Sequence, residues 1–319
     1  MTDPVRWGVL GAGWLVQRAT AAAIHHAEGA TLFATGARDI SRAHATEPQV
    51  AYDSYQAVID DPRVEAVYIC LSNDAHLPWI QASIEAGKHV LCEKPMVLSY
   101  EQAAYAFTLA ETAGLHLVEA TWSRWHPRMR RIVELAASGA LGKISEYRAT
   151  FTFEGVDEGN YRLFPQHGGG ALYDVGIYPL HGLVACLPEI EDFTVADVLH
   201  VMGGDGVDMT TQGVLSWGND TRASIEGSFI LPASQELTVQ GSDGQVRVTD
   251  NEAFATWRSP TTLLVNGHAE EFGPVDAYQV MFEEVSDRIR GGAGWLLPAS
   301  DSLRVARTVD SLLPSPSDA

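Results

Sequence analysis

The stretch RWGVLGAGWLV, residues 6–16, carries the pattern that decides the fold of the chain. Its first half, RWGVL (6–10), has the composition of a buried strand, and Gly11 and Gly13 follow directly. Apolar residues then recur at helical spacing as far as Ala23. A strand, a glycine-containing turn and a helix in this order predict the opening of an α/β sheet, with a turn suited to a dinucleotide pyrophosphate.

The same alternation of strand and helix patterns continues to about residue 120. The apolar runs expected as strands are 30–36, 65–71, 89–92 and 115–120. Between them lie helical patterns, of which the clearest runs from 99 to 113. Continuous apolar strands separated by helices indicate a parallel sheet covered on both faces. We therefore predict a doubly wound α/β Rossmann domain over residues 1–121.

The remainder of the chain, residues 122–319, has a different pattern. SEYRATFTF (145–153) alternates between apolar and polar residues, as a half-exposed strand does. Further strands are predicted at 222–231, 236–240, 245–249 and 261–265, and helices near 129–137, 170–183, 277–290 and 300–312. This order predicts a second, α+β domain with a mainly antiparallel open sheet.

Composition excludes several classes of partner and site. The 319 residues include 21 basic and 41 acidic residues, for a net charge of −20, which repels nucleic acid and anionic lipid. The three cysteines form no CxxC and no HExxH occurs, so no metal site is predicted. No apolar run approaches the roughly 18 residues of a membrane span, and no secretion signal is visible. We expect a cytoplasmic protein with a small-molecule substrate.

The end of the second predicted strand bears on the choice of dinucleotide. An NAD site usually offers a carboxylate there, whereas an NADP site offers arginine. In ATGARDISRA (34–43), Ala37 stands at the carboxylate position, and Arg38 and Arg42 follow. Two arginines suit a 2′-phosphate, so NADP is predicted in preference to NAD. The alternative is a pair of solvated charges, with Asp39 capping the next helix.

Lysine is scarce in this chain, and one of the three stands in VLCEKPMVL (90–98). Lys94 follows a strand at its carboxyl end, the edge where ligands bind in open α/β sheets. Taken alone, it could equally be a lysine whose stem is covered and whose ammonium lies in water.

The motif around Lys94 resembles a known family. HVLCEKP (89–95), with SNDAH (72–76) before it, is similar to the Glu-Lys-Pro signature of the glucose–fructose oxidoreductase and inositol dehydrogenase family, Gfo/Idh/MocA. EATWSRWHP (119–127) and GGGALYDVGIYPL (168–180) resemble its NADP-dependent dihydrodiol and D-xylose dehydrogenase branch. The resemblance runs from residue 5 to about 312, with Val16 in place of the small residue that closes the glycine fingerprint.

The resemblance implies a set of site residues. It implies Lys94 and Tyr178 as the catalytic pair, Asp174 close to both, and a cis bond before Pro95. The implied cofactor contacts are Gly11, Gly13, Trp14, Leu15, Arg38, Arg42, Leu71, Ser72, Asn73, His76, Glu93 and Lys94. The substrate candidates are Trp122, Arg124, Trp125, Tyr161 and Asp174. For His76 helix capping is the alternative, and for the crossover at 122–126 it is packing between domains. For Asp174 and Tyr178 the alternative is an acidic residue at a helix N-terminus and a core tyrosine.

The implied chemistry is hydride transfer between nicotinamide and a sugar, polyol or cyclic diol. Tyr178 would act as the acid/base, and since tyrosine has a reference pKa of about 10, Lys94 would favour its phenolate and polarise the substrate oxygen. The alternatives are a reductase of a ketosugar or nucleotide-linked ketodeoxysugar, and a non-catalytic dinucleotide-dependent regulator. The resemblance also implies a homodimer or homotetramer through the C-terminal sheet.

Overall fold

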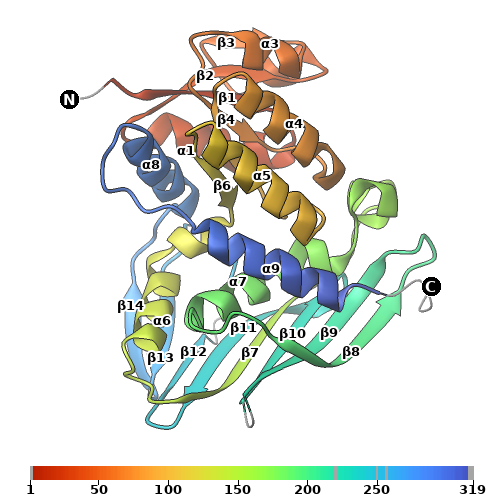
Figure 1. Ribbon diagram of the computed structural model, residues 1–319, viewed down its shortest axis with the longest axis vertical. Helices are drawn as coiled ribbons and strands as arrows, with labels where there is room; N and C mark the ends of the chain where they lie inside the picture. The colour runs from red at the N-terminus through yellow and green to blue at the C-terminus, as the bar shows by residue number, and fades with distance from the viewer. Residues whose placement is uncertain (1–2, 219–220, 249–250, 256–257, 315–319) are drawn as a thin grey trace. The chain divides into compact units, whose positions relative to one another are not determined.

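The computed structural model describes residues 3–218, 221–248, 251–255 and 258–314 (Figure 1). Its contacts divide the chain into two compact units. The first consists of Met1–Trp122 and Asp276–Ala299, and the second of Ser123–Val275 and Ser300–Ala319. None of the helices in the described ranges is long and apolar enough to cross a membrane.

The first unit is built on a six-stranded parallel sheet with strand order β3-β2-β1-β4-β5-β6. Its strands are β1 (Val5–Leu10), β2 (Ala30–Gly36), β3 (Val50–Tyr52), β4 (Ala66–Ile69), β5 (His89–Glu93) and β6 (Leu117–Ala120). Its helices are η1 (Val16–Thr20), α1 (Ala21–His26), α2 (Ile40–His44), α3 (Tyr55–Asp60), α4 (Asn73–Glu85), α5 (Tyr100–Thr112) and α8 (Ala277–Ile289). The order reverses between β1 and β4, which confirms the predicted doubly wound fold.

Helix α8 joins the first unit although it follows the second sheet in the sequence (Figure 1). Phe282 packs edge-on against Trp7 at 5.2 Å and against Tyr68 at 5.3 Å between ring centroids. The indole Nε1 of Trp7 donates to Ser286 Oγ at 3.0 Å. The sequence predicted a single boundary between the domains at 121/122, whereas in the structure residues 276–299 also belong to the first unit. Periodicity shows which face of a helix is apolar but not which sheet that face covers.

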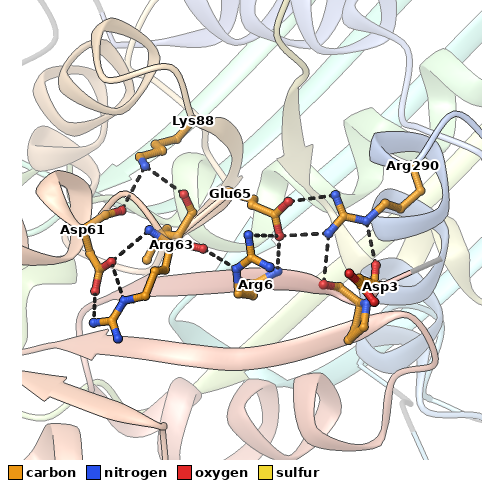
Figure 2. A network of polar contacts seen from close by, with 9 residues as sticks. Asp3, Arg6, Asp61, Arg63, Glu65, Lys88 and Arg290 are labelled. Carbon is orange, nitrogen blue, oxygen red and sulfur yellow. Dashed lines mark hydrogen bonds and ion pairs between the residues drawn. The ribbon is translucent and has the colours of Figure 1, made fainter.

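A polar network surrounds the amino ends of the strands in the first unit (Figure 2). Lys88 Nζ donates to the carbonyl oxygens of Asp61, at 3.0 Å, and Val64, at 2.7 Å, and its burial lowers its pKa. Arg290 of the α8 end binds both carboxylate oxygens of Glu65 at 2.8 Å. The edge formed by the amino ends of these strands therefore has a structural role. The buried lysine of the chain is Lys88, at this edge, whereas Lys94 is partly exposed.

The second unit is built on an eight-stranded sheet with order β14-β13-β12-β11-β7-β10-β9-β8. Its strands are β7 (Ile144–Glu154), β8 (Thr194–Met202), β9 (Asp208–Trp217), β10 (Thr221–Ser228), β11 (Ile230–Gly241), β12 (Gln245–Val248), β13 (Thr261–Val265) and β14 (His268–Phe272). Its helical segments are η2 (Trp122–Trp125), α6 (Pro127–Ala137), η3 (Tyr161–Leu163), η4 (Pro165–His167), η5 (Leu172–Gly176), α7 (Ile177–Cys186) and α9 (Ala299–Leu312). The first residues of η2 and α9 belong to the first unit. Only β7 and β10 pair in parallel, so the mainly antiparallel sheet is confirmed.

Several strands of this sheet differ from the sequence prediction. The strand predicted at 222–231 is two strands, because the chain leaves β10 after Ser228 and begins β11 at Ile230. The run predicted at 236–240 is the later part of β11, and β8, β9 and β14 were not predicted. In β8 the apolar residues Val198, Leu199 and Val201 are themselves exposed, so this strand has no apolar–polar alternation to detect. The run predicted at 245–249 ends outside the described residues.

Candidate functional site

The glycine turn after β1 lies where the strand order reverses. Gly11 has φ +99°, and a Cβ there would lie 2.4 Å from the carbonyl oxygen of Cys70. Its amide donates to Gly36 O at 2.9 Å, so the turn is held between the ends of β2 and β4. At Gly13 a Cβ would meet nothing within 4 Å. Only glycine fits at position 11, and the backbone at 13 is left open to a ligand.

The helix that follows the glycine turn includes a π-helical segment near its start. Trp14 and Leu15 precede η1, a π-helical stretch that begins at Val16, whose side chain is fully buried. Trp14 is 71% exposed, with the guanidinium of Arg18 5.5 Å from its ring centroid. The departure from the fingerprint at Val16 thus coincides with a local widening of the helix, while the glycine turn itself is formed.

The two arginines after β2 are exposed. Asp39 caps α2, accepting from Ser41 N at 2.9 Å and from Ser41 Oγ at 2.6 Å, and these hydrogen bonds lower its pKa. The capping interpretation of Asp39 is therefore correct, but it leaves Arg38 and Arg42 on the surface at the carboxyl end of β2. Among the described residues neither guanidinium is within ion-pair distance of a carboxylate, although the charge of Arg42 contributes to the lowered pKa of Asp39, so both can bind an anion.

His76 links the ends of two neighbouring strands. It lies in the first turn of α4, directly after the predicted contacts Leu71, Ser72 and Asn73, and its ring is fully buried. Nδ1 lies 2.8 Å from the carbonyl oxygen of Pro95, and Nε2 lies 3.2 Å from that of Leu71. Burial lowers the pKa of His76, so a neutral ring donates to one of the two carbonyls. A contact with nicotinamide stays a prediction.

The Glu-Lys-Pro motif places the Glu93 carboxyl in the interior and Lys94 at the carboxyl edge of the parallel sheet. Glu93 ends β5 and is buried; it accepts a hydrogen bond from the Tyr68 hydroxyl at 2.6 Å, and burial raises its pKa to about 7. Lys94 follows with a partly exposed side chain, and the Lys94–Pro95 bond is cis, as the resemblance implied. Together with His76, these residues form the carboxyl edge of β4 and β5.

Asp174 and Tyr178 belong to the second unit. They lie about one turn apart on the helix formed by η5 and α7, and each is 7% exposed. The ring of Tyr178 lies 5.4 Å from that of Phe151 and 6.1 Å from that of Phe254. The Tyr178 ring therefore packs against Phe151 of β7 and against Phe254, which lies between β12 and β13 in the sequence.

The glycine run 168–170 allows the chain to close around the start of this helix. A Cβ on Gly169 would lie 2.5 Å from the carbonyl oxygen of Arg162, and one on Gly170, at φ +122°, would lie 2.1 Å from Asp208 Oδ1. Asp208 Oδ2 accepts from Leu172 N at 2.8 Å and caps the helix. The triple glycine is thus required for close packing, and it brings Arg162 to the first turn of the helix.

The sequence places Arg162 beside Tyr161, ahead of the glycine run, where both could reach the substrate cleft, but Arg162 was not selected as a site residue. Its Nε donates to Asp174 Oδ2 at 2.6 Å, and its guanidinium lies 5.0 Å from the centroid of the Tyr161 ring. Burial alone would lower the pKa of Arg162, but the Asp174 carboxylate raises it above its usual value through its charge and its hydrogen bond, and the phenolate forms of Tyr161 and Tyr178 add to this. The only sequence signal for this role is its position shortly before the glycine run.

The crossover residues have structural contacts. Trp122 is stacked on Tyr278 at 5.0 Å within the first unit. In the second unit Arg124 is 6% exposed, donates to Asp301 Oδ2 at 3.0 Å and to His181 O at 3.3 Å, and Trp125 is fully buried. The Arg124 contacts lie within the second unit, so they do not test the alternative of packing between domains, and a role of Arg124 and Trp125 in substrate binding stays a prediction. Within the described ranges, no three His, Cys, Asp or Glu side chains are grouped as a metal site.

The predicted site residues thus form two groups. The cofactor candidates gather at the carboxyl ends of β1, β2, β4 and β5 in the first unit. Asp174 and Tyr178, with Tyr161 close to their partner Arg162, gather in the second unit. The pairing of Lys94 with Tyr178 stays a prediction.

Comparison with known proteins gives the same two-part division. Residues 5–121 match the model of an oxidoreductase family with an NAD-binding Rossmann fold, and residues 129–247 match the GFO/IDH/MocA C-terminal domain. The chain belongs to the Gfo/Idh/MocA oxidoreductase family. It is an NAD(P)-dependent oxidoreductase, so the expected family and enzyme class are confirmed and the non-catalytic regulator is set aside.

Relatives and solved structures match over most of the chain. D-xylose 1-dehydrogenase (NADP(+)) 2 of Haloferax volcanii is 32% identical, covering 97% of this chain and 96% of that protein. Trans-1,2-dihydrobenzene-1,2-diol dehydrogenase of Mus musculus is 30% identical, covering 85% and 80%. The crystal structure of a 3-ketoreductase from Actinomadura kijaniata, in complex with NADP and TDP-benzene, is 26% identical with a TM-score of 0.88, covering 97% of each chain.

Proposed function

We propose that this family member is an NADP-dependent dehydrogenase that oxidises a CH–OH group of a sugar, polyol or cyclic diol, or reduces the matching carbonyl. The observation that carries the proposal is the η5–α7 helix, where Tyr178 packs against Phe151 and Phe254 and Asp174 lies about one turn before it. Such a surface offers hydrogen bonds and an apolar face, as polyhydroxylated ligands require.

The first unit fits an NADP cofactor. The open backbone at Gly13 and the start of the following helix suit the pyrophosphate. Arg38 and Arg42, exposed and without ion-pair partners among the described residues, suit the 2′-phosphate. The nicotinamide, when bound, supplies the hydride acceptor or donor. The D-xylose dehydrogenase relative, named for NADP(+), supports the same choice.

The chain supplies the proton transfer and the charge that assists it. In oxidation Tyr178 accepts the proton of the reacting hydroxyl, and in reduction the same phenol returns it. Lys94 is proposed to stabilise the negative charge that develops on the substrate oxygen and to favour the phenolate of Tyr178. Asp174 is proposed to orient the Lys94 ammonium or to bind a substrate hydroxyl.

A ketosugar reductase is the second candidate. It is favoured by the likeness to the 3-ketoreductase, whose crystal contains TDP-benzene. A diphosphate would require free positive charge in the second unit. There Arg124 is paired with Asp301, Arg131 with Glu270, and Arg162 with Asp174. These three arginines are therefore not free to bind a diphosphate, although Lys143, Arg222 and Arg247 of the same unit are exposed.

We also propose that the protein forms a homodimer or homotetramer through the large sheet of the second unit. The exposed apolar residues Val198, Leu199 and Val201 of β8 support this contact. Light scattering on the purified protein measures its mass in solution, and a monomer at all concentrations would contradict the proposal.

The proposed activity is tested by reduction of NADP, with NAD in parallel, against a panel of aldoses, polyols and trans-diols that includes D-xylose. Turnover of one substrate with NADP, lost in Tyr178→Phe, is expected. NADP-dependent turnover that survives in Tyr178→Phe would contradict the assigned acid/base. Turnover only of a nucleotide-linked ketosugar would select the second candidate.

A further inference from the structure

The ion pair between Arg162 and Asp174 has no part in the chemistry described so far. The distance from Arg162 Nε to Asp174 Oδ2 is 2.6 Å, and the Asp174 side chain is 9% exposed. Asp174 lies about one turn before Tyr178 on the same helix, so the carboxylate that Arg162 binds and the phenol are carried by adjacent turns. The Arg162–Asp174 pair therefore lies beside the helical turn that carries Tyr178 in the second unit.

Arg162 is fixed by its backbone as well as by its side chain. Its amide donates to Asn160 Oδ1 at 3.1 Å, and its carbonyl oxygen accepts from Gly170 N at 2.9 Å. Its guanidinium lies over the ring of Tyr161. Because a guanidinium is planar and stays protonated, a residue held in this way keeps its charge in one place, unlike a flexible lysine.

We propose that Arg162 is a positioning residue for the reaction: it holds the Asp174 carboxylate in place and keeps a permanent positive charge within electrostatic range of the Tyr178 phenol. This inference rests on the proposed role of Tyr178 as acid/base. It adds a second cation, carried by the same unit as the tyrosine, to the effect proposed for Lys94. The phenolate is then favoured even where Lys94 is absent.

A purely structural ion pair would have a different signature. If Arg162 only held the 161–164 loop against the helix, removing either partner would change stability but not the ionisation of Tyr178. If the charges act on the phenol, removing the positive one and removing the negative one must shift its ionisation in opposite directions. The sign of the shift therefore separates the two roles.

The experiment is a pH titration of the full chain by ¹³C NMR, with tyrosine labelled at Cζ and the Tyr178 signal identified by its loss in Tyr178→Phe. In Arg162→Met we expect the Tyr178 midpoint to rise by about one pH unit, because a positive charge is lost and Asp174 is left without its cation. In Asp174→Asn we expect it to fall, because Arg162 remains. Arg162→Lys should lie between wild type and Arg162→Met.

Arg131→Met is the matched control. Arg131 Nε donates to Glu270 Oε2 at 3.0 Å, so this variant removes a comparable ion pair elsewhere in the second unit, and the Tyr178 midpoint should stay in place. If Arg162→Met does not fold, Arg162→Lys and Asp174→Asn carry the test. The pH profile of kcat/KM on the panel substrate should shift in the same directions.

The experiments distinguish a failure of the role proposed for Arg162 from a failure of the acid/base role proposed for Tyr178. Unchanged midpoints in both Arg162→Met and Asp174→Asn, or shifts of the same sign, would overturn the role of Arg162 while Tyr178→Phe still abolishes turnover. Turnover that survives in Tyr178→Phe would overturn the proposed acid/base, and the role of Arg162 with it.

Discussion

His76 Nδ1 lies 2.8 Å from the carbonyl oxygen of Pro95, so the first turn of α4 is tied to the residue that follows Lys94. The other ring nitrogen lies 3.2 Å from Leu71 O, at the end of β4. One fully buried side chain thus connects the two loops that form the predicted nicotinamide edge. His76 contacts the Glu-Lys-Pro motif through the backbone oxygen of Pro95, so we expect it to hold the segment that carries Lys94 in place.

His76→Ala should destabilise the first unit and reduce turnover. The substitution removes the one hydrogen bond that the neutral ring donates to a carbonyl oxygen and opens a cavity, so we expect a loss of about 2 to 3 kcal/mol in the free energy of unfolding. Urea denaturation followed by circular dichroism measures it, with the exposed His44→Ala as control. Equal stability of both variants would show that the bridge contributes nothing.

Lys94→Ala should reduce kcat by about two to four orders of magnitude and leave the Kd for NADP nearly unchanged, because the ammonium acts on the reacting oxygen. Stopped-flow turnover and fluorescence titration with NADP separate the two quantities. Lys143→Ala, an exposed lysine of the second unit, is the matched control and should behave as wild type. A large loss of NADP affinity in Lys94→Ala would assign the lysine to cofactor binding instead.

Replacing Arg38 and Arg42 together by alanine should weaken NADP binding by about 10- to 100-fold, because charge-assisted bonds to the 2′-phosphate are lost. NAD carries no such phosphate, so its Kd should change little. Calorimetric titration with both dinucleotides measures this, with the exposed Arg247→Ala as control. An equal loss for NAD and NADP would mean that the arginines only support the loop.

Glu93 should make stability depend on pH. Its pKa is raised by burial from 4.5 to about 7, so the folded protein retains a proton that the unfolded chain releases within that window. The stability contributed by this group is present at low pH and falls as the pH rises from about 4.5 to 7, by about 3 kcal/mol.

The comparison of wild type with Glu93→Gln isolates this contribution. Thermal unfolding across the window should show wild type losing stability relative to Glu93→Gln as the pH rises, since glutamine has no charge to bury. The exposed Glu101→Gln should run parallel to wild type. A constant difference between wild type and Glu93→Gln would contradict the raised pKa.

The features determined by the sequence alone are those that depend on neighbours along the chain. Periodicity showed the strands and helices of the Rossmann sheet, and the glycine turn at Gly11 followed from local turn chemistry. Lys94 could be placed at the carboxyl edge because it directly follows a recognisable strand. The second sheet was predicted only in part, because β8 exposes apolar residues and lacks alternation.

Only the tertiary structure decided which distant residues meet. It placed α8 on the first sheet through Phe282, gave His76 its two carbonyl partners, and paired Arg162 with Asp174 across the glycine run. It also showed that Lys88 is the buried lysine, satisfied by the carbonyls of Asp61 and Val64. These are contacts between segments far apart in sequence or joined by irregular loops, where burial and hydrogen-bond geometry leave no periodic pattern in the chain.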